Sequence, residues 1–185
     1  MEEFIIPSIL SNHYQSDDFN DLLNQIIKDF KNMIENRDPS EAMRLMVSTQ
    51  NYIERSQWKE NPNLHIRVGD VCYIDFGSAY QLEAGYQHFG LVFSKSHGKL
   101  FVIPMSSNSS AFSQAYDPLD NPNGKKHLLK FVKSCGLKKD STLFLNDAKF
   151  ISPTRVIEVI GHLSPVDLRY KRIQVRLFET LFKTL

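Results

Sequence analysis

The segment "GYQHFGLVF", residues 85–93, places one histidine at the mouth of an otherwise apolar pair of predicted strands. The second strand of the pair, "KLFVIPMSS", ends on two serines. A protonated imidazole can bind a phosphate, a neutral one can take up a proton near pH 7, and a hydroxyl can hydrogen-bond to a phosphoryl oxygen. His88, Ser106 and Ser107 are therefore candidate catalytic residues. The alternative is a surface histidine followed by ordinary turn serines.

The bulk composition limits the class of protein. With 185 residues, the chain can bury a core as one domain with an appendage or as two small domains. Cys72 and Cys135 form no C-x-x-C pair, which favours a reduced, cytoplasmic protein over a disulfide framework. The N-terminal apolar run is short and is broken by Pro7, so we expect neither a signal peptide nor a membrane span. No spacing typical of metal ligands occurs, so we expect no metal and no cofactor.

The N-terminal third of the chain has a helical pattern. Apolar residues recur every three or four positions over residues 17–36, which predicts an amphipathic helix that Ser16 can cap. Asp38 is a suitable N-cap for a second helix over 39–57, with Pro39 in its first position. Residues 59–65, "KENPNLH", indicate a linker. We therefore predict a helical hairpin in an N-terminal extension covering residues 1–64.

Charge is divided unevenly between the two parts. Residues 1–64 hold eleven acidic side chains against six basic ones, and residues 65–185 hold ten acidic against sixteen basic. A basic C-terminal part favours contact with a polyanion. Attraction between the two parts, or ordinary solvated faces, would explain the same asymmetry.

From Arg67 onward the pattern changes to short strands without intervening helices. β-forming residues occupy the segments "VGDVCYIDFG", "FGLVFS", "KLFVIPM", "HLLKFV", "STLFLND", "AKFIS" and "RVIEVIGHL". Residues 96–98 read as a hairpin turn, and 106–124 as a polar excursion. "SPVD", residues 164–167, is a capping signature for a last helix. We predict an α+β fold in which a small antiparallel barrel, residues 65–185, is followed by a C-terminal helix.

The order and spacing of these segments resemble those of the PemK/MazF/Kid family of toxin endoribonucleases. The resemblance covers about residues 66–182 and rests on "RVGDVCYIDFG", a loop containing Glu83 and Gly85, "GLVFS", "LFVIPMSS", "DSTLFLNDAKFIS" and "RVIEVIGHLS". It implies an SH3-like barrel that forms a homodimer and cleaves single-stranded RNA without a metal. It also implies a cognate antitoxin that occupies the RNA groove.

The chain departs from the family pattern at two places. His88 stands where the family usually has its catalytic arginine, and "DAKFI", residues 147–151, replaces the pattern Q-[IV]-R-T-I. The family's threonine or serine is retained as Ser106. The resemblance implies attack by the ribose 2′-OH on the adjacent phosphorus, which leaves a 2′,3′-cyclic phosphate and a 5′-OH. His88 can substitute for the arginine by binding phosphate or by moving a proton.

Further residues are expected to bind RNA. Glu83 could orient His88, which would raise the pKa of its imidazole, and Lys149 could add positive charge to the groove. Tyr86, like Tyr80 and Phe112, could stack on unpaired bases. Lys125 and Lys126, at the end of the polar excursion, could contact the RNA backbone. The alternatives are packing aromatics and lysines that merely protect a strand edge.

Two other functions remain open on the sequence alone. With the family arginine replaced by His88, the same fold could be a non-catalytic module that binds RNA or a protein. It could also be a toxin that acts on another protein. The experiment that separates these alternatives is incubation of the purified protein with a defined RNA in a chelator.

Overall fold

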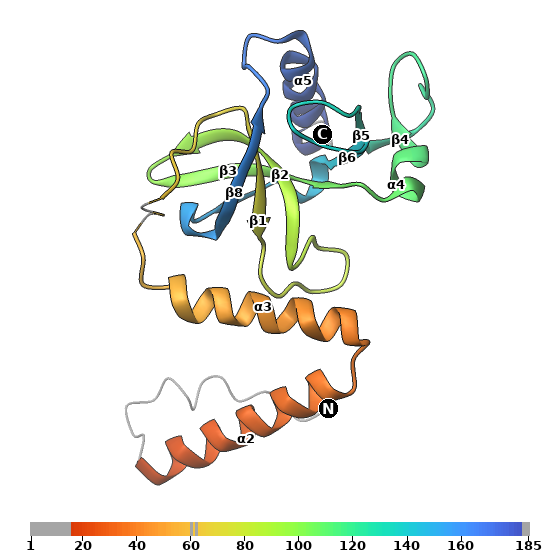
Figure 1. The fold of residues 1–185 in the computed structure, drawn as a ribbon. Coiled ribbons are helices and arrows are strands. Elements are labelled where there is room, and N and C mark those ends of the chain that lie inside the picture. The colour runs from red at the N-terminus through yellow and green to blue at the C-terminus, as the bar shows by residue number, and fades with distance from the viewer. Residues whose placement is uncertain (1–15, 60, 62, 183–185) are drawn as a thin grey trace. The chain divides into compact units, whose positions relative to one another are not determined.

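The computed structural model describes residues 16–59, 61 and 63–182 (Figure 1). The chain divides into two compact units, Met1–Met43 and Arg44–Leu185. The second unit contains the later part of a helix together with the whole sheet. We predicted an extension over residues 1–64 and a barrel domain over 65–185. These domain boundaries stay a prediction. None of the helices within the described ranges is long and apolar enough to cross a lipid bilayer.

Both N-terminal helices form where the periodicity places them. Helix α2 spans Ser16–Glu35 and helix α3 spans Pro39–Arg55. The carboxylate of Asp38 accepts hydrogen bonds from the backbone N–H groups of Ser40, at 2.9 Å, and Glu41, at 3.3 Å. These bonds satisfy two of the amide groups that a helix start leaves without partners. The predicted N-cap is therefore confirmed, and α3 ends two residues before the expected end.

The predicted strands assemble into one eight-stranded sheet (Figure 1). The strands are β1 (Asp70–Asp75), β2 (Gln87–Ser96), β3 (Lys99–Ser106), β4 (Ala115–Tyr116), β5 (Lys125–Phe131), β6 (Ser141–Phe144), β7 (Lys149–Ile151) and β8 (Val156–His162). Their order is β4-β5-β6-β3-β2-β1-β8, with β7 paired to β3, and only β4–β5 is parallel. The α+β fold with a mostly antiparallel sheet is confirmed. The sheet is not a closed barrel, because among the described residues β8 pairs with β1 alone and the two-residue β4 with β5 alone.

The β2–β3 hairpin is the element that later carries the candidate site. Ser96 pairs with Lys99, so His97 and Gly98 alone form the turn. Their φ angles are +47° and +76°, which is the requirement of a type I′ turn. Glycine meets that requirement without strain. The predicted hairpin is confirmed, and its opposite ends are residues 87–88 and 105–106.

Helix α5, Leu168–Phe182, packs against the sheet and contributes residues to the main hydrophobic core. Its buried residues Tyr170, Ile173 and Leu177 pack in one cluster with sheet residues that include Leu91 and Leu143. The helix begins three residues later than the capping signature predicts. Asp167, not Ser164, is the cap: its carboxylate accepts from the backbone N–H of Arg169 at 2.8 Å.

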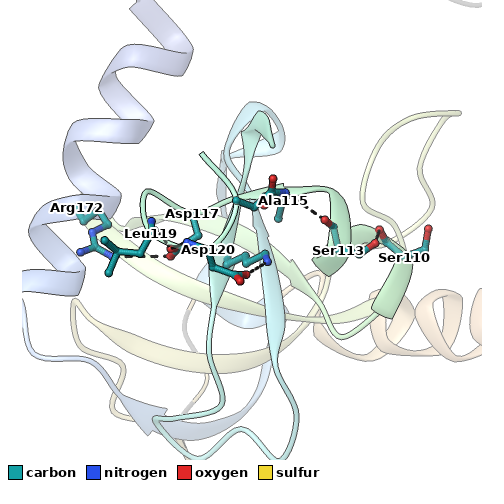
Figure 2. Close-up of polar contacts among 9 residues, drawn as sticks. Ser110, Ser113, Ala115, Asp117, Leu119, Asp120 and Arg172 are labelled. Atoms are coloured by element: carbon teal, nitrogen blue, oxygen red, sulfur yellow. Dashed lines mark hydrogen bonds and ion pairs between the residues drawn. The ribbon is translucent and has the colours of Figure 1, made fainter. Parts of the chain in front are cut away.

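The polar excursion folds into a small structured unit. Helix α4, Ser109–Gln114, leads into β4, and the turn after β4 is held by Asp117. Figure 2 shows the Asp117 carboxylate between the Arg172 guanidinium of α5 and the loop backbone. It accepts from the N–H groups of Leu119, at 2.9 Å, and Asp120, at 3.0 Å. These bonds, with the positive charge of Arg172, lower the pKa of Asp117 below its usual value.

The Gly-Asp pair at the start of β1 connects three strands. Gly69 has a φ of +91°, and a Cβ there would lie 2.2 Å from the carbonyl oxygen of Leu163. Its N–H donates to Val92 and its carbonyl accepts from Leu163. The next residue, Asp70, is fully buried, and its carboxylate contacts the imidazole of His162 at 2.8 Å and the Arg67 N–H at 2.7 Å. The local sequence gives His162 no partner, whereas the fold gives it a structural one.

We expect Asp70→Ala to lower the free energy of unfolding by about 2–4 kcal/mol, because it leaves a cavity in place of a buried carboxylate and leaves the part-buried donors of Arg67 and His162 without their acceptor. Urea denaturation followed by circular dichroism measures the change. The matched control is Glu158→Ala, which removes an exposed carboxylate from β8 and should cost about 0.5 kcal/mol or less. Equal losses in the two variants would contradict a structural role for Asp70.

Candidate active site

A pocket of about 320 Å³ brings His88 and Ser106 together. Three segments form it: the loop between β1 and β2, the start of β2 with the end of β3, and the turn after β6. Its lining residues are Leu82, Glu83, Ala84, Gly85, His88, Pro104, Met105, Ser106, Phe144, Asn146 and Asp147. All three segments belong to the sheet unit, so the tertiary fold of that unit alone creates the pocket.

The antiparallel register explains why the two side chains meet. Phe89 of β2 pairs with Met105 of β3, and His88 and Ser106 are the next residues on their strands. Ser106 is half-buried, and its Oγ accepts a hydrogen bond from the N–H of Asn108 at 3.2 Å. That bond uses a lone pair and leaves the hydroxyl hydrogen free to donate to a ligand. Ser107, by contrast, is exposed and does not line the pocket.

The pKa of His88 is lowered from its ordinary value, first by burial and second by the positive charge of Arg44. Arg44 lies near the start of β2, because the Gln87 side chain donates to its backbone carbonyl at 3.4 Å. The net direction is opposite to the rise expected from Glu83, which is not among the causes of the shift. Glu83 lines the same pocket, and its orientation of His88 stays a prediction. Near neutral pH the imidazole is therefore uncharged and able to accept a proton.

Asp147 is a pocket residue whose role the sequence pattern did not reveal. One carboxylate oxygen accepts from the backbone N–H of Ala84 at 2.5 Å, and the other lies 2.8 Å from the Lys149 ammonium. The first contact fixes the loop that forms one wall of the pocket. The second largely neutralises Lys149. The sequence offered one signal: Asp147 stands at the family's glutamine position, two residues before Lys149.

The remaining predicted RNA-binding residues lie outside the pocket. Lys125 and Lys126 are exposed on β5, and Lys149 is on β7 with its ammonium 5.9 Å from the Phe76 ring centroid. Tyr86 ends the β1–β2 loop with a φ of +58°, and its backbone bonds to Phe76 and Gly77. Their contact with RNA stays a prediction. Within residues 16–59, 61 and 63–182, no three His, Cys, Asp or Glu side chains form a group that could hold a metal ion.

Comparison with known proteins gives structural similarity without sequence similarity. No family model and no curated protein matches the sequence. Three similar solved structures are MazF toxins, the family that the sequence resembles. MazF of Deinococcus radiodurans is 13% identical, with a TM-score of 0.48, and the match covers 64% of this chain and 98% of that one. MazF-mt6 of Mycobacterium tuberculosis is 11% identical, with a TM-score of 0.42, and the match covers 62% of this chain and 96% of that one. A MazE–MazF structure of Deinococcus radiodurans is 10% identical, with a TM-score of 0.41, and the match covers 66% of this chain and 100% of that one. At such identities, the roles of this chain's residues must be argued from its own geometry.

The lowered pKa of His88 gives a direct prediction. In an NMR titration, the His88 ring proton should titrate below pH 6.5, the ordinary value. Arg44→Gln removes a nearby positive charge and should raise the pKa of His88 toward that value, whereas Arg172→Gln, on α5, should leave it unchanged. An unchanged His88 pKa in Arg44→Gln would show that burial alone lowers this pKa.

Proposed function

We propose that this protein is a metal-independent endoribonuclease that cleaves single-stranded RNA at the pocket lined by His88 and Ser106. The observation that supports the proposal most strongly is that an imidazole with a lowered pKa and a hydroxyl with a free hydrogen line one pocket. Metal-free RNA cleavage requires a group that takes up the 2′-OH proton and a donor for the phosphoryl oxygens. This pair can supply both.

The proposed step is an internal transesterification. Neutral His88 takes the proton of the ribose 2′-OH as the 2′ oxygen bonds to the adjacent phosphorus. The bond from phosphorus to the 5′ oxygen breaks, and that oxygen takes up a proton from water. The products are a 2′,3′-cyclic phosphate and a 5′-OH. The Ser106 hydroxyl donates to a non-bridging phosphoryl oxygen, where charge increases in the transition state.

Arg44 is the proposed source of positive charge in place of the family arginine. It is exposed on α3, lies close enough to His88 to lower its pKa, and forms no ion pair with a carboxylate of the described residues. A guanidinium matches two phosphoryl oxygens at once. Lys149 is a weaker candidate because Asp147 neutralises it. Glu83, on the pocket wall, is placed to contact the ribose or a base.

The biological assignment is part of the same proposal. The family resemblance supports a toxin of a toxin–antitoxin system that acts in the cytoplasm on mRNA, forms a homodimer and is silenced by a cognate antitoxin. Lys125, Lys126 and Tyr86 would then contact the RNA beyond the scissile bond. Co-expression with the antitoxin partner should relieve growth arrest caused by the wild-type chain, and a His88→Ala chain should cause none.

We expect the purified full chain to cleave a defined single-stranded RNA in excess EDTA and to leave ends that bear a cyclic phosphate and a 5′-OH. His88→Ala should lower the cleavage rate by about 10²–10⁴-fold, because it removes the proton acceptor. The control is His127→Ala, which removes an exposed histidine from β5 and should change nothing. Intact RNA after incubation with folded wild-type protein would refute the nuclease.

Two neighbouring serines allow a matched pair of variants. Ser106→Ala should lower the cleavage rate by about 10²-fold, because a hydrogen-bond donor to the phosphoryl group is lost. Ser107→Ala, one residue away but exposed and outside the pocket, should retain wild-type activity. Single-turnover kinetics on the same RNA measure both. The opposite ranking would move the catalytic hydroxyl to Ser107.

A non-catalytic module that binds RNA or protein is the second candidate. The observation in its favour is the ion pair between Lys149 and Asp147, in which the carboxylate compensates a positive charge that could otherwise face RNA. Such a module would bind the RNA of the previous experiments and leave it uncut. The same assay in EDTA therefore separates the two functions.

A further inference from the structure

A second cavity, of about 430 Å³, shares no lining residue with the His88 pocket. One wall comes from the last turns of α3 and the residues just after it. The opposite wall comes from the end of β1 and the segment between β7 and β8. The lining residues are Ser48, Thr49, Asn51, Tyr52, Arg55, Ser56, Gln57, Asp75, Gly77, Ser78, Ser152, Thr154 and Arg155.

Two arginines from the two walls line this cavity. Arg55 is partly buried, and its Nε and Nη1 atoms are inaccessible to solvent and have no hydrogen-bond partner among the described residues. Its guanidinium carbon lies 5.8 Å from the centroid of the Trp58 ring. Arg155 is partly buried as well, and it uses one nitrogen to donate to the Asp75 carbonyl at 3.2 Å. Buried guanidinium donors without acceptors are costly, which points to a missing acceptor.

The cavity's single carboxylate does not neutralise these arginines. Asp75 is 4% exposed, and its oxygens accept from Ser48 Oγ at 2.7 Å, the Gly77 N–H at 2.9 Å and Asn51 Nδ2 at 2.6 Å. Among the residues that the structure describes, neither arginine forms an ion pair. The lining therefore carries two positive charges against one negative charge that is already bound by three donors.

The other lining groups suit an oxyanion. Ser56 and Ser78 are exposed residues of the cavity wall, and the hydroxyls of Ser152 and Thr154 lie 2.8 Å from one another. Gly77 has no side chain, and a Cβ there would lie 2.9 Å from Arg155 Nη1, so the glycine leaves room for the guanidinium. Guanidinium forks with hydroxyl donors around them match the tetrahedral oxygens of a phosphate.

We propose that this cavity is a phosphate-binding site in which Arg55 and Arg155 hold the anion from opposite walls. Its volume exceeds that of inorganic phosphate and leaves room for an attached nucleoside next to the exposed ring of Tyr52. The phosphate belongs either to a free ligand or to a nucleic-acid chain. The β1–β2 loop contributes Gly77 and Ser78 to this cavity and residues 82–85 to the His88 pocket, so one strand of nucleic acid could reach both.

The first test uses the full chain and inorganic phosphate. Phosphate should raise the Tm of the wild type relative to sodium chloride of equal ionic strength, and Arg55→Met and Arg155→Met should each weaken phosphate binding by about tenfold or more in calorimetry. Arg172→Met, on α5, is the matched control. A wild-type Tm that does not respond to phosphate would overturn the proposal.

The stability of Arg55→Met without phosphate separates binding from a structural role. Because two buried nitrogens of Arg55 have no acceptor, their removal should leave the Tm of the phosphate-free protein unchanged or raise it. A large fall in that Tm would make Arg55 a structural residue and would contradict the proposal.

A second arm identifies the source of the phosphate. A single-stranded 2′-deoxyoligonucleotide with a 5′-OH cannot be cleaved through a 2′-OH, so its affinity reports binding alone. If Arg55→Met weakens its binding, the phosphate belongs to a nucleic-acid chain. If the variant affects only inorganic phosphate and mononucleotides, the ligand is a free phosphate. Phosphate and the deoxyoligonucleotide report binding without any cleavage, so failure of the nuclease leaves this proposal standing.

Discussion

A buried hydrogen-bond network around Ser48 is the contact on which both candidate sites depend. Its Oγ donates to the Asp75 carboxylate at 2.7 Å and accepts from the Gln87 side chain at 2.7 Å. Asp75 ends β1, Gln87 begins β2, and the two residues pair across the sheet. The Ser48 hydroxyl of α3 therefore hydrogen-bonds to the residues at both ends of the β1–β2 loop. Because Ser48 and Asp75 are both buried, removing either side chain leaves the other without this hydrogen bond.

The hydrogen bonds of Ser48 also determine where positive charge lies near the two candidate sites. They position the later part of α3 against the strand ends, and with it Arg44 near His88 and Arg55 in the second cavity. Arg155 reaches the same cavity from the sheet and bonds to the backbone of Asp75. Helix α3 thus brings guanidinium groups to the sheet. Strand β2 itself has His88 where the family pattern usually has an arginine. Under our proposal, the helix compensates for the arginine that the strand lacks.

Several features of the fold could be predicted because they depend on neighbours in the sequence. Helix α2 follows from an apolar period of three to four, the start of α3 from an aspartate before a proline, and the β2–β3 turn from a His-Gly pair that accepts positive φ. The open sheet could not be predicted in the same way. Whether β8 closes on β4 depends on strand pairs far apart in the chain, and the two-residue β4 offers too short an edge.

For the candidate site, the sequence by itself determined the reactive groups: a histidine at the start of one strand and serines at the end of the next. Only the tertiary structure decided which serine faces the histidine, because successive residues of a strand point to opposite sides. It also decided the charge of His88, since burial and Arg44 lower its pKa while Glu83 was expected to raise it. Asp147, Arg44 and Arg55 acquired their places through contacts over tens of residues. Such contacts depend on packing and burial, which no local pattern of residues encodes.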